Sequence, residues 1–130
     1  MFINLGINAA NKVPLMGVVP IVASVLTRHP TGVPILAAGH ALYVSLAVND
    51  ANCPGLVPQV GPTLVALRAH GGEEELVRSG IKFLCYVAMD AVNVPALKRA
   101  GVEAVVRPLV PRYPGNADIA KWGPILLKKV

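Results

Sequence analysis

The chain has 130 residues, the size of one domain, and carries a formal net charge of +5 from twelve Lys and Arg against seven Asp and Glu. Hydrophobic residues make up 54% and charged residues 15%, a composition that excludes intrinsic disorder, which requires low hydrophobicity and high charge. The two cysteines, Cys53 and Cys85, supply neither a disulfide framework nor a four-cysteine zinc site, and they favour a reducing intracellular location, cytoplasmic or nuclear.

The charges are distributed unevenly along the chain. Residues 1–67 contain only Lys12, Arg28 and Asp50, and the other sixteen charged residues lie in 68–130. A soluble surface normally carries interspersed charges, so we expect the N-terminal half to be covered. A membrane span is not expected there, because the longest charge-free run, 29–49, is interrupted by Pro and Gly and a span needs about 20 apolar residues.

Similar residues recur along the chain with a period of 41, which indicates a repeat protein. In the series of His29, His70 and Tyr113 the last interval is 43, so the third unit is expected to contain a two-residue insertion. The recurring sets are Asn11, Asn52 and Asn93; Leu15, Leu56 and Leu97; Tyr43 and Leu84; and then His29, His70 and Tyr113, each followed ten residues later by Gly39, Gly80 and Gly123.

In chain order, residues 1–8 are predicted to form the end of a partial repeat, and the three units that follow cover 9–49, 50–90 and 91–130. Each unit is predicted to contain a short, a middle and a long helix. The long helices are expected near 34–48, 74–89 and 117–128, and the whole chain is expected to be all-α, without a sheet.

The second unit shows this pattern best. A short helix is expected over 53–57 and a middle helix over 61–70, which has Pro62 in its first turn and Gly71 and Gly72 after its end. Glu73, Glu74 and Glu75 then favour the start of the long helix, because carboxylates complement the positive end of the helix dipole. The third unit is expected to be irregular, because three prolines interrupt its helices: Pro108, Pro111 and Pro124.

The repeat also predicts the core. The glycine near the centre of each long helix is expected to let the preceding helix approach closely. Apolar residues at inward phases are expected to be buried, namely Leu46, Leu56, Leu64, Leu67, Phe83, Leu84 and Val87.

The unit plan resembles the armadillo repeat over nearly the whole chain. The matching residues are Asn52 before the short helix, Gly61 and Pro62 at the start of the middle helix, and Leu46 with Ala47 at the end of the long helix. The resemblance implies a right-handed α-solenoid that binds extended peptides or partner domains in a groove lined by the long helices.

In armadillo proteins an Asn ladder in this groove holds the backbone of the partner. The register places Asn4, Ser45, Tyr86 and Lys129 at the ladder position, and only Asn4 matches the family. Ala41 and Lys82 occupy the position of the family's tryptophans. The partner-binding residues are therefore predicted to be Asn4, Ser45, Lys82 and Tyr86, and the partner is predicted to be a protein or an extended peptide.

A second interface is predicted at the N-terminal end, where charges are scarce and the chain begins within a helix. An uncapped end of a repeat array exposes what a neighbour would cover, such as a preceding repeat or a second copy. The residues expected to form this interface are Phe2, Leu5, Val18, Val19 and Val22.

No motif of catalysis or of cofactor binding is present in the sequence, so we expect no enzyme activity, no cofactor and no metal. His29 and His70 are expected one repeat step apart, roughly 8–10 Å, too far for one zinc ion without convergence, and a role at helix ends is favoured. His40 has no carboxylate three or four positions away. Cys85 is expected in the core, whereas Cys53 could be exposed.

Two other functions remain open. The chain could be a small structural subunit packed permanently in a large complex, or an RNA-binding solenoid. Against the second, the basic residues of 68–130 are interspersed with acidic ones, which favours a solvated face of mixed charge over a nucleic-acid site.

Overall fold

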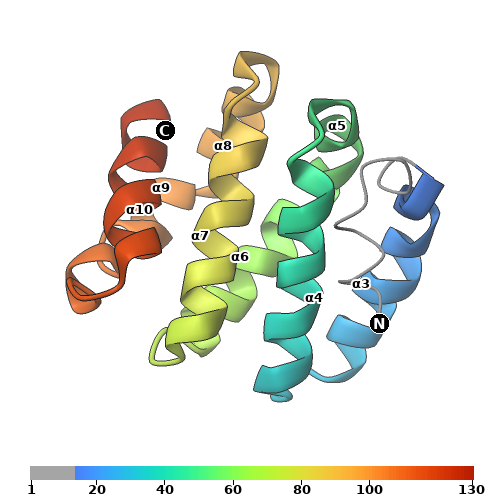
Figure 1. Ribbon diagram of the computed structural model, residues 1–130, viewed down its shortest axis with the longest axis horizontal. Helices are drawn as coiled ribbons and strands as arrows, with labels where there is room; N and C mark the ends of the chain where they lie inside the picture. Colours follow the sequence, from blue (N-terminus) through green and yellow to red (C-terminus); the bar gives the residue numbers. More distant parts are fainter. Residues whose placement is uncertain (1–13) are drawn as a thin grey trace.

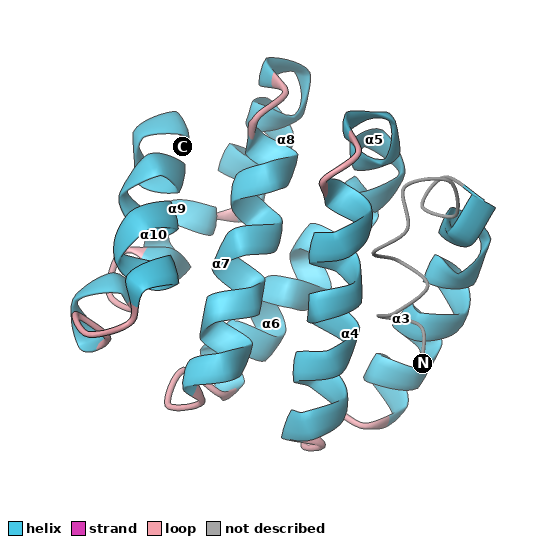
Figure 2. Ribbon diagram, in the orientation of Figure 1, coloured by secondary structure: helices cyan, strands magenta, loops and turns pink. Residues whose placement is uncertain are grey.

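The computed structural model describes residues 14–130, and this part of the chain is helical and contains no strand (Figure 2), which confirms the all-α prediction. Short 3₁₀ segments connect the α-helices. In chain order the elements are η1 (Pro14–Val18), α3 (Val19–Arg28), α4 (Val33–Ala47), η2 (Asp50–Asn52), α5 (Cys53–Leu56), η3 (Val57–Gln59), α6 (Val60–Ala69), α7 (Glu74–Ala88), η4 (Ala91–Asn93), α8 (Val94–Ala100), α9 (Val102–Val106), η5 (Val110–Arg112) and α10 (Ala117–Lys129).

The predicted long helices are α4, α7 and α10, and each begins within one residue of its predicted start. Two of the starts have clear local causes. Glu74 and Glu75 lie in the first turn of α7, where they complement the helix dipole. The side chain of Asn116 accepts a hydrogen bond from the backbone N–H of Ile119 and so caps α10.

The long helices form one layer. Figure 1 shows α4, α7 and α10 side by side in chain order, with α6 and α9 behind them, and α7 packs against both α4 and α10. One continuous core runs between the layers. All seven residues that were predicted to face the core are buried, each with at most 2% of its surface exposed. They are Leu46, Leu56, Leu64, Leu67, Phe83, Leu84 and Val87.

The glycine at the centre of each long helix has the predicted role. A Cβ on Gly39 would lie 2.7 Å from Leu26, one on Gly80 would lie 2.9 Å from Leu67, and one on Gly123 would lie 2.5 Å from Val110. Real Cβ atoms do not approach so closely. The absence of a side chain therefore brings the preceding helical segment against the long helix in all three units.

Two of the asparagines that recur every 41 residues, Asn52 and Asn93, make the same hydrogen bond, and Asn11 lies outside the described residues. Asn52 Nδ2 donates to the carbonyl of Leu46 at 2.9 Å, and Asn93 Nδ2 donates to that of Val87 at 3.1 Å. Both asparagines are buried. Each satisfies a carbonyl in the last turn of a long helix, which has no partner within the helix.

We expect Asn93→Ala to lower the free energy of unfolding by about 1–3 kcal/mol, because the Val87 carbonyl would lose its side-chain donor in a buried place. Urea denaturation measures this loss. Val92→Ala is the matched control, since Val92 is exposed one position away and should change stability little. Equal stability of the two variants would contradict the structural role of the recurring asparagine.

A second recurring contact joins consecutive units. His70 Nε2 donates to the carbonyl of Pro30 at 2.7 Å, and the Tyr113 hydroxyl donates to the carbonyl of Gly71. His70 and Tyr113 share one phase of the repeat, and so do Pro30 and Gly71. His70 also terminates α6, as predicted for a histidine at a helix end.

The third unit departs from the other two, as predicted. Its middle helix, α9, has five residues where α6 has ten, and Pro108 lies two positions beyond its end. Gly101, before α9, has a φ of 84°, a conformation that favours glycine. Pro124 does not interrupt α10, however, and the helix continues through it to Lys129.

Candidate functional site

The predicted groove residues lie on the layer of long helices. Ser45 is on α4, Lys82 and Tyr86 are on α7, and all three side chains are half-buried. Asn4, the fourth predicted residue, lies outside the described residues. The structure thus brings three of the predicted residues to two neighbouring helices.

Tyr86 is part of an aromatic pair. Its ring centroid lies 5.3 Å from that of Trp122 on α10, with the planes inclined by 37°, and Lys121 Nζ lies 5.1 Å from the centroid of the Trp122 ring. Aromatic rings at this centroid separation attract each other. Trp122 was not among the predicted site residues; the one signal for it was that it is the only tryptophan in the chain.

The charges beside Tyr86 are paired between α7 and α10. Lys82 Nζ lies 3.8 Å from Asp118 Oδ2, and Arg78 Nη1 donates to the same oxygen at 3.0 Å. Arg78 Nη2 also donates to Glu75 Oε2 at 2.8 Å, and hydrogen bonds to Glu75 and Asp118 raise the pKa of Arg78. These partly exposed pairs contribute little to stability, but they make this face one of mixed charge.

The predicted exposure of the N-terminal interface is corrected. Val19 and Val22 are buried, with 4% and 7% of their surfaces exposed, and belong to the core; Val18 is half-buried. The opposite face of α3 is exposed instead, with Ile21 at 59% and Val25 at 38%. Residues 19 and 22 are one helical turn apart and so face inward together, whereas 21 and 25 share the outer face. Phe2 and Leu5 lie outside the described residues.

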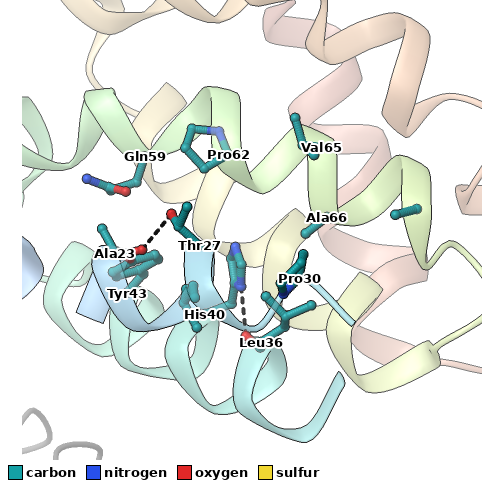
Figure 3. A pocket seen from close by; sticks show the side chains of 12 residues that line it. Ala23, Thr27, Pro30, Leu36, His40, Tyr43, Gln59, Pro62, Val65 and Ala66 are labelled. Atoms are coloured by element: carbon teal, nitrogen blue, oxygen red, sulfur yellow. Dashed lines mark hydrogen bonds between the residues drawn. The ribbon is translucent and has the colours of Figure 1, made fainter. Parts of the chain in front are cut away.

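A cavity of about 370 Å³ opens between α3, α4 and α6 (Figure 3). Its wall is mainly apolar, and Figure 3 shows that the residues of α4 lie beneath those of α3 and α6. The lining residues are Ala23, Leu26, Thr27, Pro30, Leu36, His40, Tyr43, Gln59, Pro62, Val65, Ala66 and Ala69.

His40 is buried in this wall and links α4 to α6. Its Nδ1 lies 2.7 Å from the carbonyl of Leu36 and its Nε2 lies 3.0 Å from Thr63 Oγ1. A carbonyl only accepts, so Nδ1 carries a proton. Burial lowers the pKa of His40, which favours the neutral ring at pH 7. The single proton of the Thr63 hydroxyl is donated to the carbonyl of Gln59 at 2.7 Å.

We expect the stability of the fold to decrease as the pH is lowered from 7 to 5. The pKa of His40 is about 6.5 in the unfolded chain and lower in the folded protein, so below pH 7 the unfolded state binds more protons and is favoured. The contribution is at most about 1.4 kcal/mol per pH unit. Thermal melts should show a smaller pH dependence in His40→Ile, which introduces the residue found 41 positions later. Superimposable pH profiles of variant and wild type would contradict a buried neutral His40.

Tyr43 lies beside His40 and makes no polar contact. Its ring centroid is 5.4 Å from that of Phe83 and 5.5 Å from that of His40. Within residues 14–130 its hydroxyl is the one buried side-chain N or O atom that lacks a hydrogen-bond partner. Burial raises the pKa of Tyr43 to about 12, so the hydroxyl keeps its proton at neutral pH.

The cysteines are both buried, which confirms the core position of Cys85 and decides the exposure that the sequence left open for Cys53. Cys53 Sγ lies 3.4 Å from the carbonyl of Ala47, because α5 folds back beneath the end of α4. Burial raises the pKa of Cys85 to about 11, so its thiol is a poor nucleophile. In the described part of the chain, no three His, Cys, Asp or Glu side chains are grouped to hold a metal ion.

Between residues 14 and 130, no single helix is both long and apolar enough to cross a membrane. One pair of consecutive helical segments, Glu74–Ala88 and Ala91–Ala100, is together long and apolar enough to cross a membrane, but the two segments are bent by 108° at the break between them.

Comparisons with known protein families, with curated proteins and with solved structures found no match to this chain.

Proposed function

We propose that this protein is a non-enzymatic protein-interaction module built as an armadillo-like, right-handed α-solenoid. The support for the solenoid is that the same contacts recur in successive units, such as the Asn52 and Asn93 hydrogen bonds and the close approach at Gly39 and Gly80. In solenoids each unit contacts its neighbours in chain order, and α4, α7 and α10 lie in that order.

The proposed binding face is the outer side of these long helices. The observation that carries the proposal is the row of half-buried polar and aromatic side chains there, from Ser45 through Lys82 and Tyr86 to Trp122. Aromatic side chains that keep part of their surface exposed are typical anchors in protein interfaces. The paired charges beside them can hydrogen-bond to an extended peptide.

Selection of linear peptides by phage display on the full chain tests this function. We expect a common motif among the selected peptides and an affinity at least tenfold lower for Tyr86→Ala, because an aromatic anchor is lost. Arg99→Ala, on the exposed side of α8, is the control and should bind as the wild type does. Failure to enrich any peptide, or equal binding by Tyr86→Ala, would refute the proposed face.

We also propose a second interaction surface on the outer face of α3, formed by Ile21 and Val25. We expect the wild type to self-associate or to bind a hydrophobic dye, and the double variant Ile21→Lys and Val25→Lys to lose this property while keeping its helicity. Size-exclusion chromatography with light scattering measures the mass. The control is Val92→Lys, at an exposed residue in η4. A wild type that is monomeric at high concentration and binds no dye would contradict this surface.

A further inference from the structure

The three long helices differ in charge beyond their first turns. α4 contains no charged residue between Val33 and Ala47. In α7 and α10 the acidic residues are confined to the first turn, and every charged residue that follows is a cation. These cations are Arg78, Lys82, Lys121, Lys128 and Lys129. The layer of long helices is therefore uncharged at α4 and basic along most of α7 and α10.

The one carboxylate of α10 is already neutralised by α7. Asp118 Oδ2 accepts a hydrogen bond from Arg78 at 3.0 Å and lies 3.8 Å from Lys82 Nζ. In the described part of the chain, none of the three lysines of α10 takes part in an ion pair. The cations of α7 thus have counter-charges within the fold, whereas the protein supplies none to the lysines of α10.

Two of these lysines lie beside the half-buried aromatic pair. Lys121 Nζ is 5.1 Å from the centroid of the Trp122 ring, which is paired with Tyr86. Lys129 is close enough to α7 for its charge to act on Cys85, the neighbour of Tyr86. The helix dipole accounts for a cation in the last turn, such as Lys129, but not for Lys121 in the middle of α10. An aromatic surface with cations beside it is complementary to a partner that carries apolar and acidic side chains.

We propose that the partner of the long-helix face is an acidic peptide segment, an inference that rests on the peptide-binding function proposed above. An apolar side chain of the segment packs on Tyr86 and Trp122, and Asp or Glu side chains beside it bind Lys121 and Lys129. Hydrogen bonds between ammonium and carboxylate groups are stronger than neutral ones. The two lysines are eight positions apart, roughly 12 Å along the helix, so two acidic residues engage them. A basic segment would meet like charges and is rejected.

Three synthetic peptides of equal length test this preference on the full chain by fluorescence anisotropy. All contain the same leucines and one tryptophan, and their remaining residues are Glu in the first, Gln in the second and Lys in the third. We expect the Glu peptide to bind roughly three- to tenfold more tightly than the Gln peptide, the equivalent of two partly exposed ion pairs, and the Lys peptide to bind most weakly. Added salt should weaken the Glu peptide and leave the Gln peptide unchanged.

The double variant Lys121→Gln and Lys129→Gln removes the two charges. We expect it to bind the Glu and Gln peptides equally, because the preference depends on these lysines. The matched control is Lys98→Gln with Arg99→Gln, which removes the same charge from exposed positions of α8 and should keep the preference. Tyr86→Ala should weaken the Glu and Gln peptides by the same factor, because both lose the same apolar contact.

Equal affinity of the wild type for the Glu and Gln peptides would overturn the acidic partner, and so would absence of binding by the Glu peptide. Loss of the preference in the α8 control as well would show a general effect of net charge and would also overturn it. If Tyr86→Ala still weakens binding in these cases, the proposed face stands and only its partner is wrong. A short oligouridylate that binds at least as tightly as the Glu peptide would instead assign the surface to nucleic acid and refute the inference.

Discussion

Replacement of Leu84 by Ala is expected to lower the free energy of unfolding by about 2–5 kcal/mol. Leu84 has none of its surface exposed and lies on α7, the long helix that packs against both α4 and α10. Truncation of its side chain removes apolar contacts and leaves a space that tightly packed neighbours fill only in part. Urea denaturation followed by circular dichroism at 222 nm measures the loss.

The matched control is Val65→Ala on α6, because Val65 is 64% exposed and its truncation should cost less than about 0.5 kcal/mol. A Leu84→Ala variant with a loss as small as that of the control would mean that the 41-residue register assigns the wrong residues to the core.

The second large effect is expected from Gly80→Val, which should lower the free energy of unfolding by about 1–3 kcal/mol. A Cβ at position 80 would already lie 2.9 Å from the side chain of Leu67, and Leu67 is itself buried, so its side chain would have to shift among packed neighbours. The added methyl groups would therefore force α6 away from α7. Urea denaturation followed by circular dichroism at 222 nm measures this loss as well.

Gly115→Val is the control, because nothing lies within 4 Å of a Cβ at position 115, in the turn before α10. We expect this variant to retain stability within about 0.5 kcal/mol. If Gly80→Val proved as stable as Gly115→Val, the close approach of the middle helix to the long helix would not be a determinant of this fold.

The parts of the fold that repeat in the sequence could be predicted. Leu46, Leu84 and the glycines each occupy a fixed position of the 41-residue repeat, and these positions predicted where the helices and the buried residues lie. The positions recur because packing of one unit on the next imposes the same requirement every 41 residues. Local signals, such as the glutamates before α7, then defined where the long helices begin.

Contacts that do not repeat could not be predicted. The link from His40 to Thr63 joins residues 23 positions apart on different helices, and no pattern in the sequence marks it. The inward face of α3 and the burial of Cys53 depend on which neighbours the chain brings near. Exposure was therefore assigned wrongly for Val19 and Val22, and for Cys53 it was left open. Tyr43 shared a phase with Leu84, and this identified it as a core residue but gave no sign of an unpaired hydroxyl.

The long helices of successive units stack side by side in chain order. The distance from α4 to α10, across α7, tests this arrangement most directly. Spin labels at Ala38→Cys on α4 and Lys121→Cys on α10 occupy exposed positions, whereas the native Cys53 and Cys85 are buried. With α7 between them, the helix axes should be separated by roughly 20 Å, twice the usual 8–10 Å. Pulsed electron paramagnetic resonance should therefore give one narrow distance distribution near that value. A distance of only about one helix spacing, as in a closed bundle, or a broad distribution would contradict the stacked arrangement.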